Sequence, residues 1–137
     1  MAFKVKSGKV KTIWMPVTPS TAIARGTLVA FTSGKLVAAT SATTTLFIEG
    51  ILDKAIVSTD ADYALDRKVP VVVPLEKFVV YEADVTSGLV AADIGLEQDL
   101  TDGATVNRAA SAVDVCKCIQ VISTTKGLFL VKVGGAY

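Results

Sequence analysis

The sequence contains no histidine, the side chain that most often acts as a general base or ligates a metal. Its only cysteines, Cys116 and Cys118, are one residue apart, a poor separation for a disulfide. Two thiols without histidine also fall short of the four ligands that structural zinc requires. We therefore expect reduced, half-buried cysteines, no metal, no cofactor and no enzymatic activity.

Charge and long apolar runs are also scarce. Charged residues make up 20% of the chain and hydrophobic residues 51%, with a formal net charge of +1. No window reaches the roughly 20 mostly apolar residues of a membrane span, and the first residues lack the apolar core of a signal peptide. We expect a protein of a cytoplasm-like compartment with no membrane or nucleic-acid partner, whose surplus apolar surface contacts protein.

One acidic segment resembles the start of a calcium-binding loop. Asp60, Asp62 and Asp66 have suitable spacing, but Leu65 and Val71 occupy the positions where such a loop needs glycine and glutamate. We interpret residues 58–66 as a solvated acidic loop.

What the chain does contain is a series of short apolar runs. They are separated by turns that recur at roughly 8 to 12 residues, which is typical of a β-sandwich or β-barrel. Ser33-Gly34 predicts a hairpin between residues 27–32 and 35–40, and Gly50 predicts a bulge. The sequence predicts an all-β protein with little helix, a single compact β-barrel or β-sandwich domain over residues 12–137.

Residues 1–11 are predicted to form an extended basic arm. Lys4, Lys6, Lys9 and Lys11 give it positive charge, and no acidic residue occurs before Glu49. Such an arm either stays solvated or lies on an acidic neighbouring protein.

The most unusual stretch is 67–84, in which Pro70 and Pro74 bracket Val71, Val72 and Val73. A proline cannot donate to a β-ladder, so it belongs on an edge strand, at a strand end or at a bulge. Consecutive valines place apolar side chains on both faces of a strand. An apolar edge invites aggregation unless it is covered. We therefore expect another part of this protein, or another copy of it, to cover this stretch.

The second half of the chain resembles a known family. VPVVVP is followed by FVVYEADVTSG, the polar turn LTDGATVNRA, a long apolar strand and TTKGLFLVKV. This order is similar to the head decoration, or capsid cement, proteins of tailed bacteriophages over about residues 46–133. The elements that carry the likeness are turns, at Glu82-Ala83-Asp84, at Asp102-Gly103 with Val106-Asn107, and at Lys126-Gly127.

The resemblance implies a structural virion protein, made in the host cytoplasm, on the capsid exterior. It would stabilise the assembled capsid by bridging major capsid protein subunits, as a homo-oligomer with a trimer favoured. We assign capsid contact to the arm and subunit contact to the twin-proline stretch: respectively Phe3, Lys4, Val5, Lys6, Lys9 and Lys11, and Pro70, Val71, Val72, Val73 and Pro74.

Two alternatives remain open. One is another β-rich virion protein, such as a tail-tube or spike component, which would differ in symmetry. The other is a carbohydrate- or ligand-binding β-barrel module, which needs a concave site with convergent polar groups and an aromatic platform.

Overall fold

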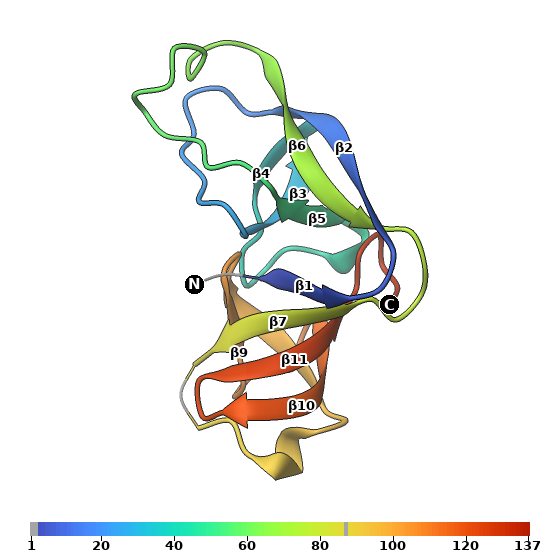
Figure 1. Cartoon of the computed structure of the whole chain (residues 1–137). Coiled ribbons are helices and arrows are strands. Elements are labelled where there is room, and N and C mark those ends of the chain that lie inside the picture. The colour runs from blue at the N-terminus through green and yellow to red at the C-terminus, as the bar shows by residue number, and fades with distance from the viewer. Residues whose placement is uncertain (1–2, 87) are drawn as a thin grey trace.

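A computed structural model describes residues 3–86 and 88–137, so that Met1, Ala2 and Ser87 lie outside the described residues. The described chain is built almost entirely of β-strands, as predicted (Figure 1). Its helical content is two short 3-10 turns, η1 (Thr45–Phe47) and η2 (Ala91–Asp93). Among the described residues, no helix has the length and hydropathy needed to cross a membrane.

The first half of the chain closes into a small barrel. Its strands, in spatial order, are β2 (Val10–Val17), β4 (Lys35–Ala38), β3 (Leu28–Thr32), β5 (Ile48–Leu52) and β6 (Arg67–Pro74). β2 and β6 pair along their whole length, from Val10 opposite Pro74 to Val17 opposite Arg67. A parallel contact of Val17 with Leu36 joins β2 to β4 and completes the ring.

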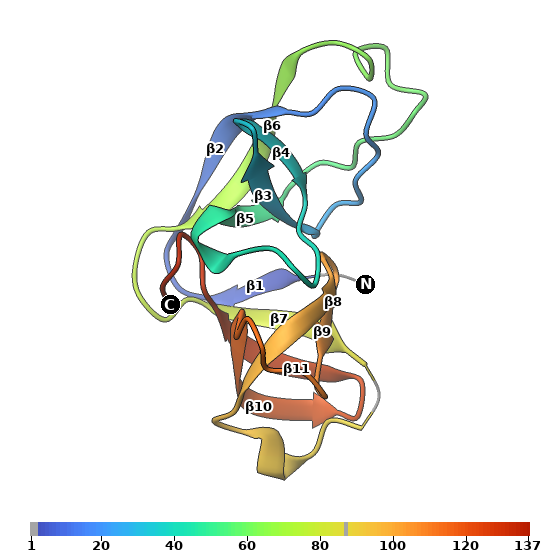
Figure 2. The same ribbon diagram turned by 180° about the vertical axis from the view of Figure 1, so that it is seen from behind.

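The remaining strands form a second sheet below the first barrel (Figures 1 and 2). Their order is β1 (Lys4–Ser7), β7 (Val80–Val85), β11 (Lys126–Val131), β10 (Cys116–Ser123), β8 (Glu97–Asp102) and β9 (Thr105–Asn107). β7 also pairs with β9 in parallel, through Asp84 opposite Thr105. This pairing curls five strands into a second barrel-like unit and leaves β1 at its edge.

A continuous apolar core joins the two units. Tyr81 and Phe129 of the second unit are fully buried in the same cluster as Leu28 and Ile51 of the first barrel. A smaller cluster fills the first barrel itself, with Val17, Leu36, Leu52 and Val71 at its centre. Burial of this kind contributes roughly 1.5–3 kcal/mol per large apolar side chain, so the contact between the units is part of the folding core.

The local predictions at Ser33-Gly34 and Gly50 are confirmed. Ser33 (φ +51°) and Gly34 (φ +81°) connect β3 and β4 as the two central residues of a type I′ hairpin. At Gly50 the β3–β5 register shifts, which marks a bulge. A Cβ at this position would lie 2.2 Å from the carbonyl oxygen of Val72, so only glycine allows β5 to approach β6 this closely.

The twin-proline strand β6 is not an edge strand, because it pairs with β2 on one side and with β5 on the other. The carbonyl of Pro70 accepts the amide of Asp53 (3.0 Å), so its nitrogen faces the same side, where β5 has already ended at Leu52. The missing N–H groups of the prolines therefore fall beyond the β5 ladder. The same chain therefore supplies a partner strand at each edge of β6.

The structure does not confirm an extended arm at residues 1–11. Phe3 is 2% exposed in the shared core, and its amide donates to the carbonyl of Gly26 (2.9 Å). β1 pairs with β7, and Val10 and Lys11 already belong to β2. The reason is the alternation of the segment, which places Phe3 and Val5 on one face, where an apolar surface of the second sheet is available.

Candidate binding surfaces

The two cysteines are buried thiols of low reactivity. Cys116 and Cys118 are free and lie on the same buried face of β10, more deeply than predicted. Burial is the main cause that raises the pKa of both thiols. A thiol held protonated is a weak nucleophile. Among residues 3–86 and 88–137, no group of three or more Cys, Asp or Glu residues is arranged to hold a metal ion.

The carboxylates of the acidic loop support the loop itself. Asp60 accepts the backbone amide of Val57 (3.1 Å), and Asp62 pairs with Arg67 (3.3 Å). Asp66 forms an ion pair with Lys35 of the hairpin. The loop is thus held by its own backbone and by basic side chains of β4 and β6, and these carboxylates do not converge on a common point.

Two buried carboxylates in the second unit were missed by sequence reasoning. Asp99 accepts the amides of Ala112, Val113 and Asp114 at 2.7–2.9 Å. Burial alone would raise the pKa of Asp99, but these three donors hold it below its usual value. The role of Asp99 is to fix the loop before β10, and no local sequence pattern indicates its distant partners.

Asp93 shapes the turn η2. Its carboxylate accepts the amide of Val90 (2.9 Å) and pairs with Arg108 (2.9 Å). The Val90 amide is the main cause that lowers the pKa of Asp93, followed by Arg108 against the opposing effect of burial. The three-residue spacing of Val90 and Asp93 is that of the acidic half of a capping box, so the sequence did hold a signal for this turn.

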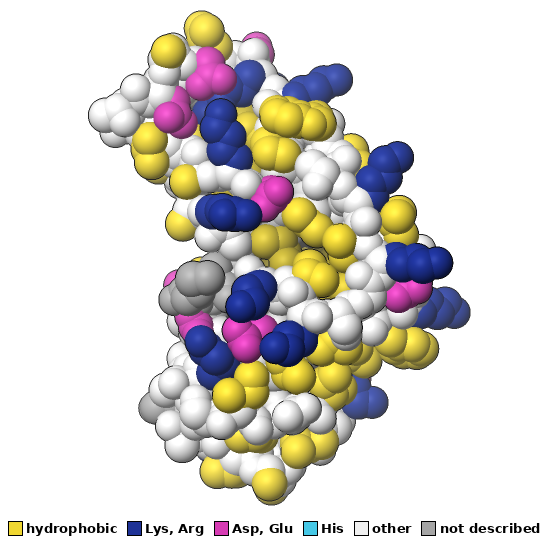
Figure 3. Space-filling view, viewed as in Figure 1, with side chains coloured by type: hydrophobic (Ala, Val, Ile, Leu, Met, Phe, Trp, Pro, Cys, Tyr) yellow, Lys and Arg dark blue, Asp and Glu magenta, His cyan; other side chains and the backbone are white. Residues whose placement is uncertain are grey.

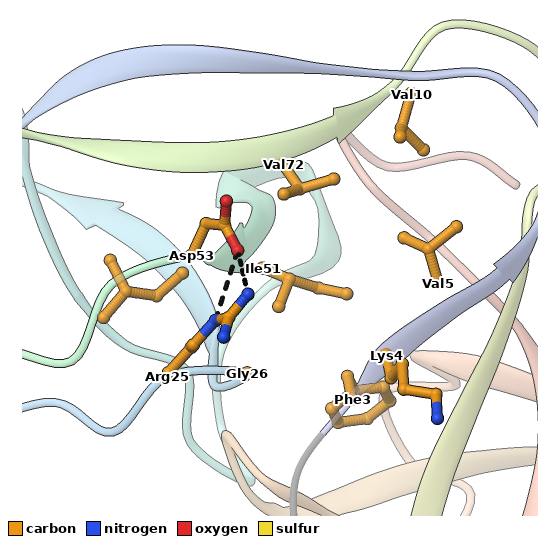
Figure 4. A pocket seen from close by; sticks show the side chains of 10 residues that line it. Phe3, Lys4, Val5, Val10, Arg25, Gly26, Ile51, Asp53 and Val72 are labelled. Atoms are coloured by element: carbon orange, nitrogen blue, oxygen red, sulfur yellow. Dashed lines mark hydrogen bonds and ion pairs between the residues drawn. The ribbon is translucent and has the colours of Figure 1, made fainter.

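A groove of about 490 Å³ lies between the two units. Phe3, Lys4 and Val5 line one wall, and the first barrel supplies the other through Ile51 and Val72. At one end Arg25 and Asp53 form an ion pair (3.1 Å) (Figure 4). Figure 3 shows the hollow between the units with hydrophobic side chains in its floor. We call this feature the inter-barrel groove.

Two groups of large apolar side chains are 43–63% exposed. The waist group lies on η1 and on the β6–β7 loop and consists of Leu46, Phe47, Leu75 and Phe78. Figures 1 and 2 place the β6–β7 loop and the C-terminal segment on the same side of the molecule. The amide of Gly135 in that segment donates to the carbonyl of Thr45 in η1 (3.0 Å). The tip group, on and beside η2 and on β10, consists of Val90, Ile94, Leu96 and Ile122.

Hydrogen bonds fix the segments that carry both groups. At the waist, the amide of Lys9 donates to Glu76 (3.0 Å) and the amide of Leu75 donates to Lys9 (2.9 Å). Phe78 has a φ of +62°, which is unusual for a bulky residue. At the tip, segment 89–96 runs beside β10 and is tied to it by the amide of Gly95, which donates to Cys118 (2.7 Å).

A much smaller recess of about 70 Å³ adjoins Trp14. Trp14 is 60% exposed on the outer face of β2, opposite Pro70. The rest of its lining mixes charged side chains, among them Asp62, Arg67 and Lys68, with the apolar side chains of Ala55, Ile56 and Val69.

The predicted contact residues divide between core and surface. In the N-terminal segment, Phe3 is buried and Val5 half-buried, whereas Lys4, Lys6, Lys9 and Lys11 are exposed. In the twin-proline strand, Pro70 and Val71 are buried, and Val72, Val73 and Pro74 are half-buried. Val71 and Val73 pack in the first barrel, and Val72 packs toward the shared core.

The chain was compared with known proteins. No protein family and no curated protein matches it.

Proposed function

We propose that this protein is a structural component of a virus particle that binds the outside of an assembled phage capsid and stabilises it by bridging major capsid protein subunits. The observation that supports this role best is the pair of exposed apolar groups, at the waist and at the tip, on one all-β scaffold. Single exposed apolar residues are ordinary, but grouped ones mark protein–protein contacts. A bridging protein needs two such contact surfaces.

The waist group is assigned to the capsid. The loop that carries Leu75 and Phe78 is bonded to Lys9, beside the exposed lysines of β1 and β2. An acidic capsid surface would therefore meet apolar and basic side chains together, as the N-terminal charge suggests. The tip group is assigned to contacts between copies, and the trimer follows the family resemblance.

The mechanism is thermodynamic linkage. A protein that binds only the assembled capsid stabilises it by about 2.7 kcal/mol per site when its free concentration is 100 times its dissociation constant. In a trimer, the three contacts act together through their effective concentration, so that each contact can be weak.

The test compares substitutions at two apolar residues of similar exposure. Phe78 is 63% exposed at the waist, and Leu65 is 60% exposed in the acidic loop of the first barrel. Phe78→Asp should weaken capsid binding about tenfold or more, because it removes a buried apolar contact and buries a charge. Leu65→Asp should bind like the original protein. Cosedimentation and electron microscopy with expanded capsids, and with unassembled major capsid protein as the control, measure both.

Two results would contradict the proposal. One is absence of bound protein on every candidate capsid, and the other is equal capsid binding by Phe78→Asp and the original protein. Leu96→Asp tests the tip separately, since it should reduce the mass of the oligomer in light scattering. Tubes or axial spikes in the electron micrographs would instead favour a tail component.

A carbohydrate-binding module is the second candidate, because exposed Trp14 stands beside a recess lined in part by charged side chains. Its volume of about 70 Å³ is well below the roughly 300–1,000 Å³ of typical ligand pockets, so this site would be a shallow stacking platform. Binding to a glycan array that disappears in Trp14→Ala would support the carbohydrate-binding candidate. Absence of binding to every glycan on the array would exclude it.

A further inference from the structure

Strand β1 has one unpaired edge, and that edge borders the inter-barrel groove (Figure 4). The amide of Phe3 donates across this edge to Gly26, a residue of the groove. In an antiparallel pair, backbone groups of successive residues face alternate sides of the strand. Val5 therefore turns its N–H and C=O the same way as Phe3, away from β7.

The partner strand gives the same answer independently. The amide of Val85 donates to Thr125 beside β11, so odd-numbered residues of β7 direct their backbone groups toward β11. Tyr81, the residue opposite Val5, shares that parity and leaves Val5 without a ladder bond. Within the described residues, the N–H and C=O of Val5 form no hydrogen bond outside the strand ladders either.

An unpaired strand edge beside an apolar groove is the arrangement by which proteins bind extended peptides as an added strand. The groove is large enough, since its 490 Å³ lies in the range of roughly 300–1,000 Å³ that ligand pockets occupy. Val5, Val10, Ile51 and Val72 offer apolar contacts for alternate side chains of a peptide.

We propose that the inter-barrel groove binds an extended segment of a different protein, which pairs with β1 through Val5. A second copy is not the donor, because pairing its β1 with this one would bring the exposed Lys4 and Lys6 of both copies together. The segment carries apolar side chains at alternate positions and acidic residues at its ends, because exposed Lys4 and Lys6 lie on β1 itself. The inference stands apart from the capsid role, since it depends only on this edge and this groove.

The probe is a capped heptapeptide of alternating valine and threonine with aspartate at both ends. Its control is the same peptide N-methylated on alternate residues, which removes the N–H groups of one edge. Titration followed by NMR should show binding of the first peptide and at least about tenfold slower exchange of the Val5 amide. The N-methylated peptide should bind about tenfold more weakly or worse.

A matched pair of variants tests Val5 directly. Val5→Pro removes the N–H that faces the groove, and an edge strand tolerates proline where that N–H is outside the ladder. Val5→Thr keeps the N–H and the branched shape. Peptide affinity should fall about tenfold in Val5→Pro and stay within about threefold in Val5→Thr.

Four results would overturn the inference: equal affinity for the two peptides, no binding of either peptide at about 1 mM, an unprotected Val5 amide at saturating peptide, or unchanged affinity in Val5→Pro. Protection of Val5 that depends on protein concentration without peptide would assign the groove to a second copy and overturn it too. If Val5→Pro does not fold, amide exchange in the original protein decides.

Discussion

The substitution Phe3→Ala tests whether the N-terminal segment is a folded strand or a free arm. In the structure, Phe3 is 2% exposed and packs in the core that joins the two units. Lys6, on the same strand, is exposed. If residues 3–7 were a free arm in solution, Phe3→Ala would not change the free energy of unfolding.

The expected loss is about 3 kcal/mol. Phenylalanine-to-alanine changes in a core cost roughly 3–5 kcal/mol through lost transfer energy and the cavity left behind. We take the lower end because β1 is a short edge strand that pairs with β7 alone, so part of it can detach instead of spanning a cavity. In a chain of 137 residues each kcal/mol shifts Tm by roughly 3 °C, so the expected decrease is about 10 °C.

Urea unfolding followed by far-UV circular dichroism measures this loss, with Lys6→Ala as the control. The control should stay within about 0.5 kcal/mol of the original protein. A loss below about 1 kcal/mol for Phe3→Ala would refute the reasoning and return residues 1–11 to the arm expected from the sequence. A loss near 3 kcal/mol also means that deletion of residues 1–11 destabilises the fold, so that deletion cannot serve as a clean test of capsid binding.

Three further predictions concern the second unit and the bulge. Asp99→Asn should lower the free energy of unfolding by about 2 kcal/mol at pH 7, because one amide oxygen replaces a carboxylate that accepts three N–H groups. Since folding lowers the pKa of Asp99, the original protein should keep this advantage above pH about 4 and lose it progressively below that pH. Urea unfolding at a series of pH values measures the difference. Gly50→Ala should lower the free energy of unfolding by about 3 kcal/mol, because the new Cβ would lie 2.2 Å from the carbonyl oxygen of Val72. Gly34→Ala has open space around its Cβ and a φ of +81°, so it should cost only about 1 kcal/mol. Equal losses in thermal unfolding would contradict the close approach of β5 to β6 at Gly50. Cys116 and Cys118 should resist Ellman's reagent at pH 8 in the folded protein and react fully in denaturant, and fast reaction of the folded protein would show that β10 opens.

The sequence predicted the parts of the fold that depend on neighbouring residues. Alternation and turn spacing gave the all-β class, Ser33-Gly34 gave a hairpin, and Gly50 gave a bulge, because each depends on local backbone conformation. The arm at residues 1–11 was not confirmed for the opposite reason. The burial of Phe3 depends on β7 and on Gly26, which are distant in sequence.

The candidate surfaces could likewise be predicted only as far as they depend on composition and neighbouring residues. Composition alone indicated surplus apolar surface, and the side chains of the waist and tip groups are part of that surplus. Their grouping could not be read from the sequence, because Ile122 meets the segment of Val90 only when β10 lies beside residues 89–96. The groove could not be predicted from the sequence either, since its walls come from residues 3–5, 10, 25–26, 51–53 and 72.

The twin-proline stretch shows the limit most clearly. The sequence by itself determined that Pro70 and Pro74 stand where a ladder bond is absent and that Val71, Val72 and Val73 need cover on both faces, because proline has no N–H and a strand alternates its side chains. Only the tertiary structure decided that the cover is this chain's own barrel and shared core. Strand pairing between distant residues is set by closure of the whole sheet, and the local pattern fits a covered edge and a closed barrel equally well.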